Sequence, residues 1–327
     1  MGAKVVGSVT SAAVLTGRPP GSRHRAMPSA SANGITIEYE TAGDPASPPL
    51  LLVMGLGGQL IAWDDAFVRD LAAAGFWVIR YDNRDVGRST WFDQAGAPDV
   101  MAAMAGHGRA AYLLSDMAAD AVGLLDALSV PSAHVVGVSM GGMIAQTMGI
   151  EHASRVRSLV SIMSTTGDTS VGQPHPEALE ALLVVPARDR AGAIDQGVAG
   201  ARVIGYPGLA FDEARVRDRA AAAYDRAFHP DGTGRQLVAI LSSGDRTKGL
   251  GGVEVPTLVI HGEADPLVDV SGGRATAAAV PGARLKLFAE MGHDLPVPLW
   301  REIIDEIATF AHPQDGRSAS APTGASA

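Results

Sequence analysis

Short, almost continuously apolar runs alternate along the chain with longer stretches whose apolar residues recur at helical spacing. The runs are typical of strands buried on both faces, and the longer stretches are typical of helices that cover a sheet. This alternation predicts an α/β fold with a mostly parallel, twisted central sheet, flanking helices and right-handed crossovers. We expect strands at 35–39, 50–54, 76–81, 133–138, 156–163, 255–260 and 284–288, and helices at 63–74, 112–128, 140–151 and 298–310.

The alternation stops between residues 166 and 250, where no strand pattern is found. Helical stretches occupy this part instead, and two of them open on Asp189 and Asp212, a residue type that suits a helix N-cap. We therefore expect a helical cap inserted into the sheet domain. The helical stretches lie at 177–185, 189–203, 212–228 and 235–242.

The two ends of the chain are rich in Pro, Gly and Ser and are predicted to be disordered. Met27 is a candidate for the biological start. The segment before it has one lysine among its first residues and a weak apolar core, which makes a poor signal peptide. We therefore expect a cytoplasmic protein, with a weak export signal as the open alternative. The predicted organisation is an extension at 1–32, a core at 33–165 and 251–312, a cap at 166–250 and a tail at 313–327.

Composition narrows the function classes. The chain has 327 residues, 46% of them hydrophobic, which is enough for one large α/β domain with an insertion. Its net charge of −9 does not attract phosphate backbones, so a nucleic-acid partner is not expected. The absence of cysteine excludes disulfides, thiolate nucleophiles and zinc sites built on cysteine. No apolar run has the length of a transmembrane segment, and the oligomeric state is left open.

A Gly-x-Ser-x-Gly pattern connects a predicted strand to a predicted helix at Gly137–Ser139–Gly141. This layout is typical of a nucleophile elbow, in which a tight turn exposes the serine hydroxyl at its apex. The glycines are needed because a Cβ on either side would collide with the neighbouring strand or helix. An ordinary serine in a glycine-rich turn is the alternative, because the pattern by itself is weak.

Two polar residues follow later strands and complete a candidate catalytic set. Asp265 comes after the strand at 255–260, and His293 comes after the strand at 284–288. Since the carboxyl ends of parallel strands meet at one edge of a sheet, we expect both side chains near Ser139. His293 would take the serine proton, and Asp265 would orient the imidazole. Asp168, after the preceding strand, is the rival for the acid, and His293 could instead be an ordinary loop histidine.

Other polar residues near these positions are assigned structural roles. His261 is expected to cap a turn, while Asp269, Asp294 and Glu263 are expected in solvated loops.

An oxyanion hole would need two backbone N–H donors near the serine. Met140, the residue after the serine, is one candidate. Leu56 is the other, because it lies in the glycine-rich segment 54–58 that follows the strand at 50–54. A plain turn is the alternative for this segment, which lacks a phosphate-binding glycine pattern.

Between residues 33 and 312 the chain resembles the α/β-hydrolase superfamily. Some segments are similar to the aclacinomycin methylesterase-type and related lipase/esterase hydrolases of actinobacteria. The resemblance is carried by three segments: 79–89 (Ile-Arg-Tyr-Asp-Asn-Arg-Asp-Val-Gly-Arg-Ser), 136–142 (Val-Gly-Val-Ser-Met-Gly-Gly) and 291–296 (Met-Gly-His-Asp-Leu-Pro).

The resemblance implies nucleophile, acid and base roles for Ser139, Asp265 and His293, in the chain order that α/β-hydrolases use. It implies an oxyanion role for Leu56 and Met140. One departure is that Met54 stands before Gly55, where most members carry histidine.

Within the first of these segments, Asp82 and Arg84 are expected to form a structural ion pair that holds the loop under the elbow.

These features together predict a serine hydrolase that cleaves carboxylic esters through an acyl-enzyme, without a cofactor or a metal. The expected partner is a small-molecule ester, and aromatic residues of the cap favour small to medium apolar groups. A serine-dependent C–C bond hydrolase, a lactonase or a perhydrolase on the same residues is the alternative, followed by a non-catalytic ligand receptor. The cap aromatics are Tyr206, Phe211, Tyr224 and Phe228, which could equally form the core of the cap.

Overall fold

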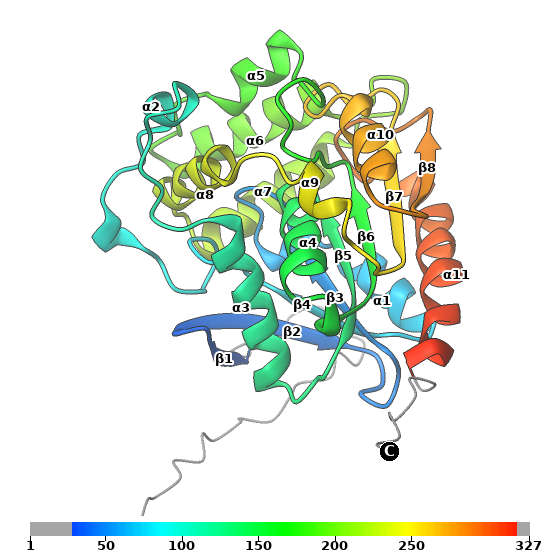
Figure 1. Cartoon of the computed structure of the whole chain (residues 1–327). Helices are drawn as coiled ribbons and strands as arrows, with labels where there is room; N and C mark the ends of the chain where they lie inside the picture. The colour runs from blue at the N-terminus through cyan, green and yellow to red at the C-terminus, as the bar shows by residue number, and fades with distance from the viewer. Residues whose placement is uncertain (1–27, 319–327) are drawn as a thin grey trace, which may run out of the picture.

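An eight-stranded sheet forms the centre of the computed structural model, which describes residues 28–318 (Figure 1). The strands follow the order β1-β2-β4-β3-β5-β6-β7-β8. The pairs β1–β2 and β2–β4 are antiparallel, and every later pair in this order is parallel. The mostly parallel sheet predicted from the sequence is therefore confirmed. The strands are β1 (Ser29–Ala32), β2 (Ile35–Ala42), β3 (Pro49–Val53), β4 (Trp77–Tyr81), β5 (Ala133–Val138), β6 (Val156–Ile162), β7 (Thr257–Gly262) and β8 (Arg284–Phe288).

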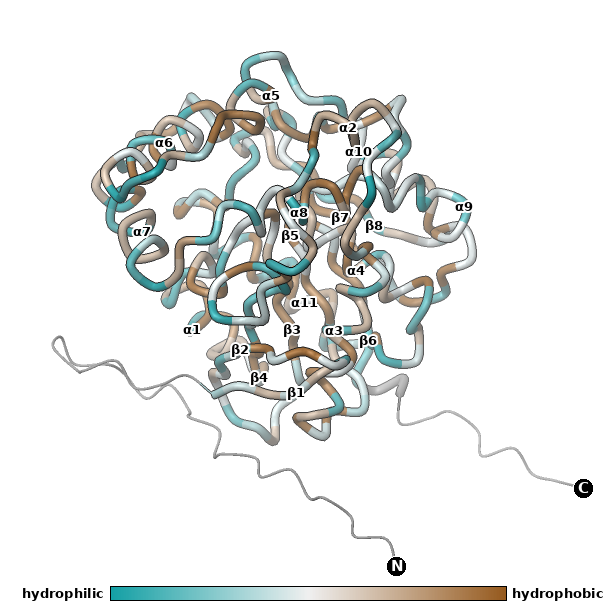
Figure 2. Tube along the Cα trace, turned by 90° about the vertical axis from the view of Figure 1, so that its left-hand side faces the viewer, coloured by the Kyte–Doolittle hydropathy of each residue, from teal (hydrophilic) through white to brown (hydrophobic). Residues whose placement is uncertain are grey.

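Strand β3 shows why the central strands are continuously apolar. Leu51 and Val53 pack into a hydrophobic cluster on one face of the sheet, while Leu50 and Leu52 pack into a second cluster on the other face. All four side chains are fully buried. Because successive strand residues point to opposite faces, helices on both sides require every position to be apolar. Figure 2 shows this as a brown centre around β3 and β5.

Helices cover both faces of the sheet (Figure 1). The first cluster includes residues of α3 and α4, and the second includes residues of α1 and α11. No helix within residues 28–318 is long and apolar enough to cross a bilayer. The helices outside the segment between β6 and β7 are α1 (Asp65–Ala73), α2 (Val100–Met104), α3 (Leu114–Ala127), α4 (Met140–Glu151), α10 (Val270–Ala279) and α11 (Trp300–Ser318).

The segment between β6 and β7 is helical, and most of it lies above the sheet in Figure 1. Two of its helices begin as the sequence predicts, because the side chain of Asp189 accepts a hydrogen bond from the Gly192 N–H and that of Asp212 from the Arg215 N–H. We refer to this segment as the cap. Its helices are α5 (Pro176–Leu182), α6 (Arg190–Ile204), α7 (Glu213–Arg226), α8 (Pro230–Ser243) and α9 (Thr247–Leu250).

The predicted end of the N-terminal extension and the predicted start of the C-terminal tail are both wrong. Strand β1 lies inside the segment 1–32 that was expected to be disordered, because the two-residue turn Asn33–Gly34 folds it back onto β2. At the other end, α11 continues into the expected tail 313–327 as far as Ser318. The side chain of Asp315 holds this extension through hydrogen bonds to His134 and Arg157. Residues 1–27 and 319–327 lie outside the described residues.

Candidate active site

The turn between β5 and α4 places Ser139 in a conformation that few residues adopt. Its backbone has φ 54° and ψ −121°, and α4 begins at the next residue. A Cβ added at Gly137 would overlap the carbonyl of Gly141, and one added at Gly141 would overlap the carbonyl of Val53. Both glycines are therefore required by close contact, because neither has a positive φ. The result has the geometry of a nucleophile elbow.

His293 reaches this turn from the loop after β8. Its Nε2 lies 3.0 Å from Oγ of Ser139. The backbone N–H of His293 donates to the carbonyl oxygen of Ile204 at 2.7 Å, so the end of cap helix α6 helps to hold the histidine in place. His293 is buried, with 8% of the residue exposed.

Asp265 lies on the far side of the imidazole. Its Oδ2 accepts from Nδ1 of His293 at 2.8 Å, while Oδ1 accepts from the backbone N–H groups of Leu267 and Val268. Burial alone would raise the pKa of Asp265, but the charge of His293 and hydrogen bonds from His293, His261 and Val268 outweigh it and lower the pKa to about 2. The carboxylate is therefore ionised and fixes the tautomer of His293.

The rival acid, Asp168, is not part of this arrangement. It is half-buried after β6, where its Oδ1 accepts from the backbone N–H of Ser170 at 2.8 Å. The structure thus brings Ser139, His293 and Asp265 together, and it places Asp168 in a local turn.

His261 is a site residue whose role sequence reasoning missed. It was expected to cap a turn, but it is fully buried at the end of β7. Its Nε2 donates to the carbonyl oxygen of Val268 at 2.8 Å and lies 3.5 Å from Oδ2 of Asp265. The sequence feature that could have indicated this contact is the position of His261, four residues before Asp265, where β7 ends. His261 therefore packs against Asp265 and favours the ionised form of its carboxylate.

The other acidic residues differ in their surroundings. Asp294 was expected in a solvated loop, but it is partly buried, and burial together with the charge of Asp265 raises its pKa. Asp269 caps α10 by accepting from the N–H of Ser271. Glu263 is exposed, as predicted.

The glycine-rich loop, residues 54–60 in the structure, lies directly against the serine. A Cβ added at Gly55 would be 3.2 Å from Cβ of Ser139 and 3.8 Å from its Oγ. The side-chain amide of Asn83 donates to the carbonyl oxygen of Met54 at 2.9 Å and holds the start of the loop. Leu56 follows Gly55 in this loop, while Met140 opens α4 beside Ser139.

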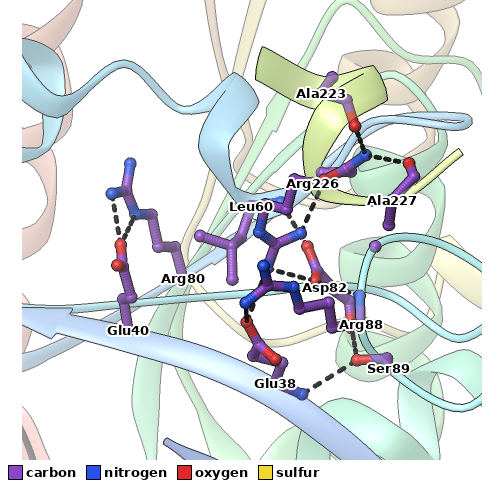
Figure 3. A network of polar contacts seen from close by, with 12 residues as sticks. Glu38, Glu40, Leu60, Arg80, Asp82, Arg88, Ser89, Ala223, Arg226 and Ala227 are labelled. Atoms are coloured by element: carbon purple, nitrogen blue, oxygen red, sulfur yellow. Dashed lines mark hydrogen bonds and ion pairs between the residues drawn. The ribbon is translucent and has the colours of Figure 1, made fainter. Parts of the chain in front are cut away.

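Asp82 and Arg84 do not form the ion pair that the sequence predicted. Asp82 pairs with Arg226 of the cap at 2.7 Å (Figure 3), and Arg84 pairs with Asp120 of α3 at 2.6 Å. Both carboxylates are almost completely buried, so each needs a guanidinium partner of its own. Although Asp82 and Arg84 are two residues apart on the chain, they form ion pairs with two different helices, α7 and α3.

Among residues 28–318, no group of three or more His, Asp or Glu side chains has an arrangement that could hold a metal ion.

Comparison with known proteins places the chain in a described family. Residues 48–297 match the model of the alpha/beta hydrolase fold. Two relatives are rhodomycin D methylesterases, DauP of Streptomyces sp. (strain C5) and DnrP of Streptomyces peucetius. Each is 32% identical to this chain, DauP over 284 residues and DnrP over 282. Each alignment covers 80% of this chain and 90% of the relative. The enol-lactonase of Burkholderia xenovorans LB400 superposes with a TM-score of 0.65 at 23% identity, over 86% of this chain and 99% of that chain.

Proposed function

Because this chain belongs to the α/β-hydrolase family, we propose that it cleaves carboxylic esters through a covalent acyl-enzyme on Ser139. Ester hydrolysis is also the reaction in the names of the two methylesterase relatives. The observation that carries the proposal is the continuous hydrogen-bonded series from Asp265 through His293 to Ser139. Nucleophile, base and orienting acid are the three groups that acyl transfer by serine requires.

In the acylation step, Oγ of Ser139 attacks the ester carbonyl carbon while Nε2 of His293 takes the hydroxyl proton. The imidazolium that forms is stabilised by the carboxylate of Asp265. We assign the backbone N–H groups of Leu56 and Met140 to the oxygen of the tetrahedral intermediate. Collapse of the intermediate breaks the ester C–O bond, and His293 returns the proton to the leaving alcohol.

Deacylation repeats the sequence with water. His293 removes a proton from the water as the water attacks the acyl carbon, and the C–O bond to Ser139 then breaks. The proton returns to Oγ of Ser139, and the carboxylic acid leaves. The protein's own side chains supply each proton transfer in this scheme.

We propose small to medium apolar esters as substrates. The backbone of Tyr206 lies against Gly292, next to His293, while its ring lies against Gly208. Other cap aromatics make contacts within the cap, since the rings of Tyr224 and Phe228 are 4.5 Å apart and Arg202 stacks on Phe211. Of the cap aromatics, we assign Tyr206 to the substrate side, because its chain segment contacts the residue next to His293.

The test is hydrolysis of p-nitrophenyl butyrate by the wild type, by Ser139→Ala and by Ser170→Ala as a surface-serine control. We expect turnover by the wild type and the control, and only background rates from Ser139→Ala. Wild-type turnover by Ser139→Ala would refute the proposal. Covalent labelling of Ser139 without turnover of any open-chain ester or lactone would instead favour a C–C bond hydrolase.

A further inference from the structure

We propose that two cap side chains, Gln236 and Arg226, are positioning residues for the oxyanion hole. Gln236 holds the glycine-rich loop (residues 54–60) at its middle, Gly57, and Arg226 holds its end, Leu60, through Asp82. The cap thus takes part in assembling the catalytic site in addition to covering it. This inference rests on the proposed function, because it assigns the Leu56 N–H of that loop to the developing oxyanion.

The first anchor is at Gly57. Its backbone N–H donates to Oε1 of Gln236 at 2.8 Å, and the side-chain amide of Gln236 donates to the carbonyl oxygen of Arg84 at 2.7 Å. Gln236 is fully buried on cap helix α8, so both of its hydrogen bonds are sheltered from water. Thr233, one turn earlier on α8, packs so closely on Gly57 that an added Cβ would be 2.8 Å from its Oγ1.

The second anchor is at Leu60, where the loop ends (Figure 3). The backbone N–H of Leu60 donates to Oδ1 of Asp82 at 2.7 Å, and Oδ2 of Asp82 pairs with Arg226 at 2.7 Å. Asp82 is fully buried, and the ion pair with the guanidinium offsets the cost of burying its carboxylate. Arg226 is the last residue of cap helix α7.

Gln59 connects the loop to the same end of α7. Its Oε1 accepts from Arg226 at 2.7 Å, and its Nε2 donates to the carbonyl oxygens of Ala223 and Ala227, each also at 2.7 Å. These carbonyls lie at the C-terminus of α7, and that of Ala223 also accepts the backbone N–H of Ala227. The cap and the loop thus satisfy each other's polar groups.

The catalytic consequence follows from where the anchors lie. Gly55 and Leu56 are between Met54, held by Asn83, and Gly57, held by Gln236. An oxyanion donor works only when it is held close to its productive position. Loosening the loop at Gly57 therefore weakens binding of the transition state more than binding of the substrate, and the loss appears in kcat.

The test compares Gln236→Met with Arg235→Met. Methionine at 236 preserves the length of the side chain and removes both hydrogen bonds. Arg235 is the matched control, because it is the neighbouring buried residue on α8 and pairs with Asp85, but not with the glycine-rich loop. The readouts are kcat and KM for p-nitrophenyl butyrate, the inhibition constant of a trifluoromethyl ketone that forms a tetrahedral adduct, and the melting temperature.

We expect Gln236→Met to lower kcat by about tenfold or more, with KM changed by less than about threefold. The affinity for the trifluoromethyl ketone should fall in parallel with kcat. Arg235→Met should lower the melting temperature at least as much as Gln236→Met does, while its kcat stays within about threefold of wild type. Arg226→Lys, which keeps a charge beside Asp82, should retain more of kcat than Arg226→Met.

Wild-type kcat and inhibitor affinity in folded Gln236→Met would overturn the proposal, as would an equal loss of kcat in folded Arg235→Met. If Gln236→Met does not fold, equal kcat values for Arg226→Lys and Arg226→Met overturn it. Ser139→Ala is assayed alongside, so failure of the proposed function is recognised separately, by turnover that survives the loss of the serine.

Discussion

Nε2 of His293 lies 3.0 Å from Oγ of Ser139, although 154 positions separate the two residues along the chain. The contact exists because one residue follows β5 and the other follows β8, and both strands end at the same edge of the sheet. A separation of 3.0 Å is within hydrogen-bond reach, as the proposed transfer of the serine proton to the imidazole requires. The kinetic effects that we expect from substitutions of Ser139 and His293 follow from this distance.

Ser139→Ala and His293→Ala should each lower kcat for an ester by about 10⁴-fold or more, because nucleophile and base act as one unit. The double variant should be no worse than the poorer single variant. Steady-state kinetics on purified, folded variants measures this. Activity of His293→Ala near that of the wild type would remove the histidine from the mechanism.

Asp265→Asn should lower kcat by about 10³- to 10⁴-fold, because an amide at 265 stabilises the wrong tautomer of His293 and cannot offset the imidazolium charge. Asp168→Asn is the matched control, since it changes the rival carboxylate without touching the imidazole. We expect its kcat to stay within about threefold of wild type. If Asp168→Asn proves the more damaging of the two, the acid has been misassigned.

The stability of the protein should depend on pH through Asp265. Its pKa in the folded protein is about 2, against about 3.9 for an aspartate in an unfolded chain. Because the folded pKa is the lower one, the carboxylate contributes its full stabilisation above about pH 5, and this is lost as the pH falls toward 2. Between pH 6 and pH 3 the wild type should lose about 1 kcal/mol more unfolding free energy than Asp265→Asn. Urea unfolding at the two pH values measures the difference, and equal losses would contradict the low pKa.

The elbow should not tolerate a methyl group at Gly137. Alanine there would overlap the carbonyl of Gly141, so we expect the free energy of unfolding to fall by about 3 kcal/mol or more. Gly200→Ala is the control, because this glycine lies in α6 with open space around its Cβ position. It should raise stability by about 0.5 to 1 kcal/mol. A wild-type melting temperature for Gly137→Ala would show that the turn is looser than the structure indicates.

The sheet, and the grouping of the candidate site residues at its edge, were predictable from sequence for a physical reason. A strand covered on both faces must be apolar at every position, so β3 and β5 appear as continuous runs. Polar residues directly after such runs, as at Asp265 and His293, collect at one edge of the sheet. Local sequence therefore located the groups, while their distances needed the folded chain.

The errors have equally specific causes. Strand β1 was missed although Asn33–Gly34 is a two-residue turn pair, and both residues have positive φ, 47° and 78°. The preceding segment is rich in Pro, Gly and Ser, and this composition predicted disorder instead of a strand. Helix α11 extends beyond its predicted end because Asp315 reaches His134 and Arg157, partners far away in the sequence.

Polar contacts between the cap and the core were outside the reach of sequence patterns. Asp82 and Arg84 look like an ion pair because they are close along the chain, but each finds its partner on a different element. No local pattern distinguishes Gln236 from other helical glutamines, and its contact with Gly57 spans 179 positions. Such contacts are set by which polar groups the tertiary fold buries together.

The most direct test of the central claim is to treat the folded protein with a fluorophosphonate and locate the adduct by peptide mass spectrometry. We predict one adduct on Ser139, none in Ser139→Ala, and labelling slowed by orders of magnitude in His293→Ala. An adduct on another residue, labelling of His293→Ala at the wild-type rate, or a folded wild type that stays unlabelled would contradict the claim that His293 activates Ser139 as the nucleophile.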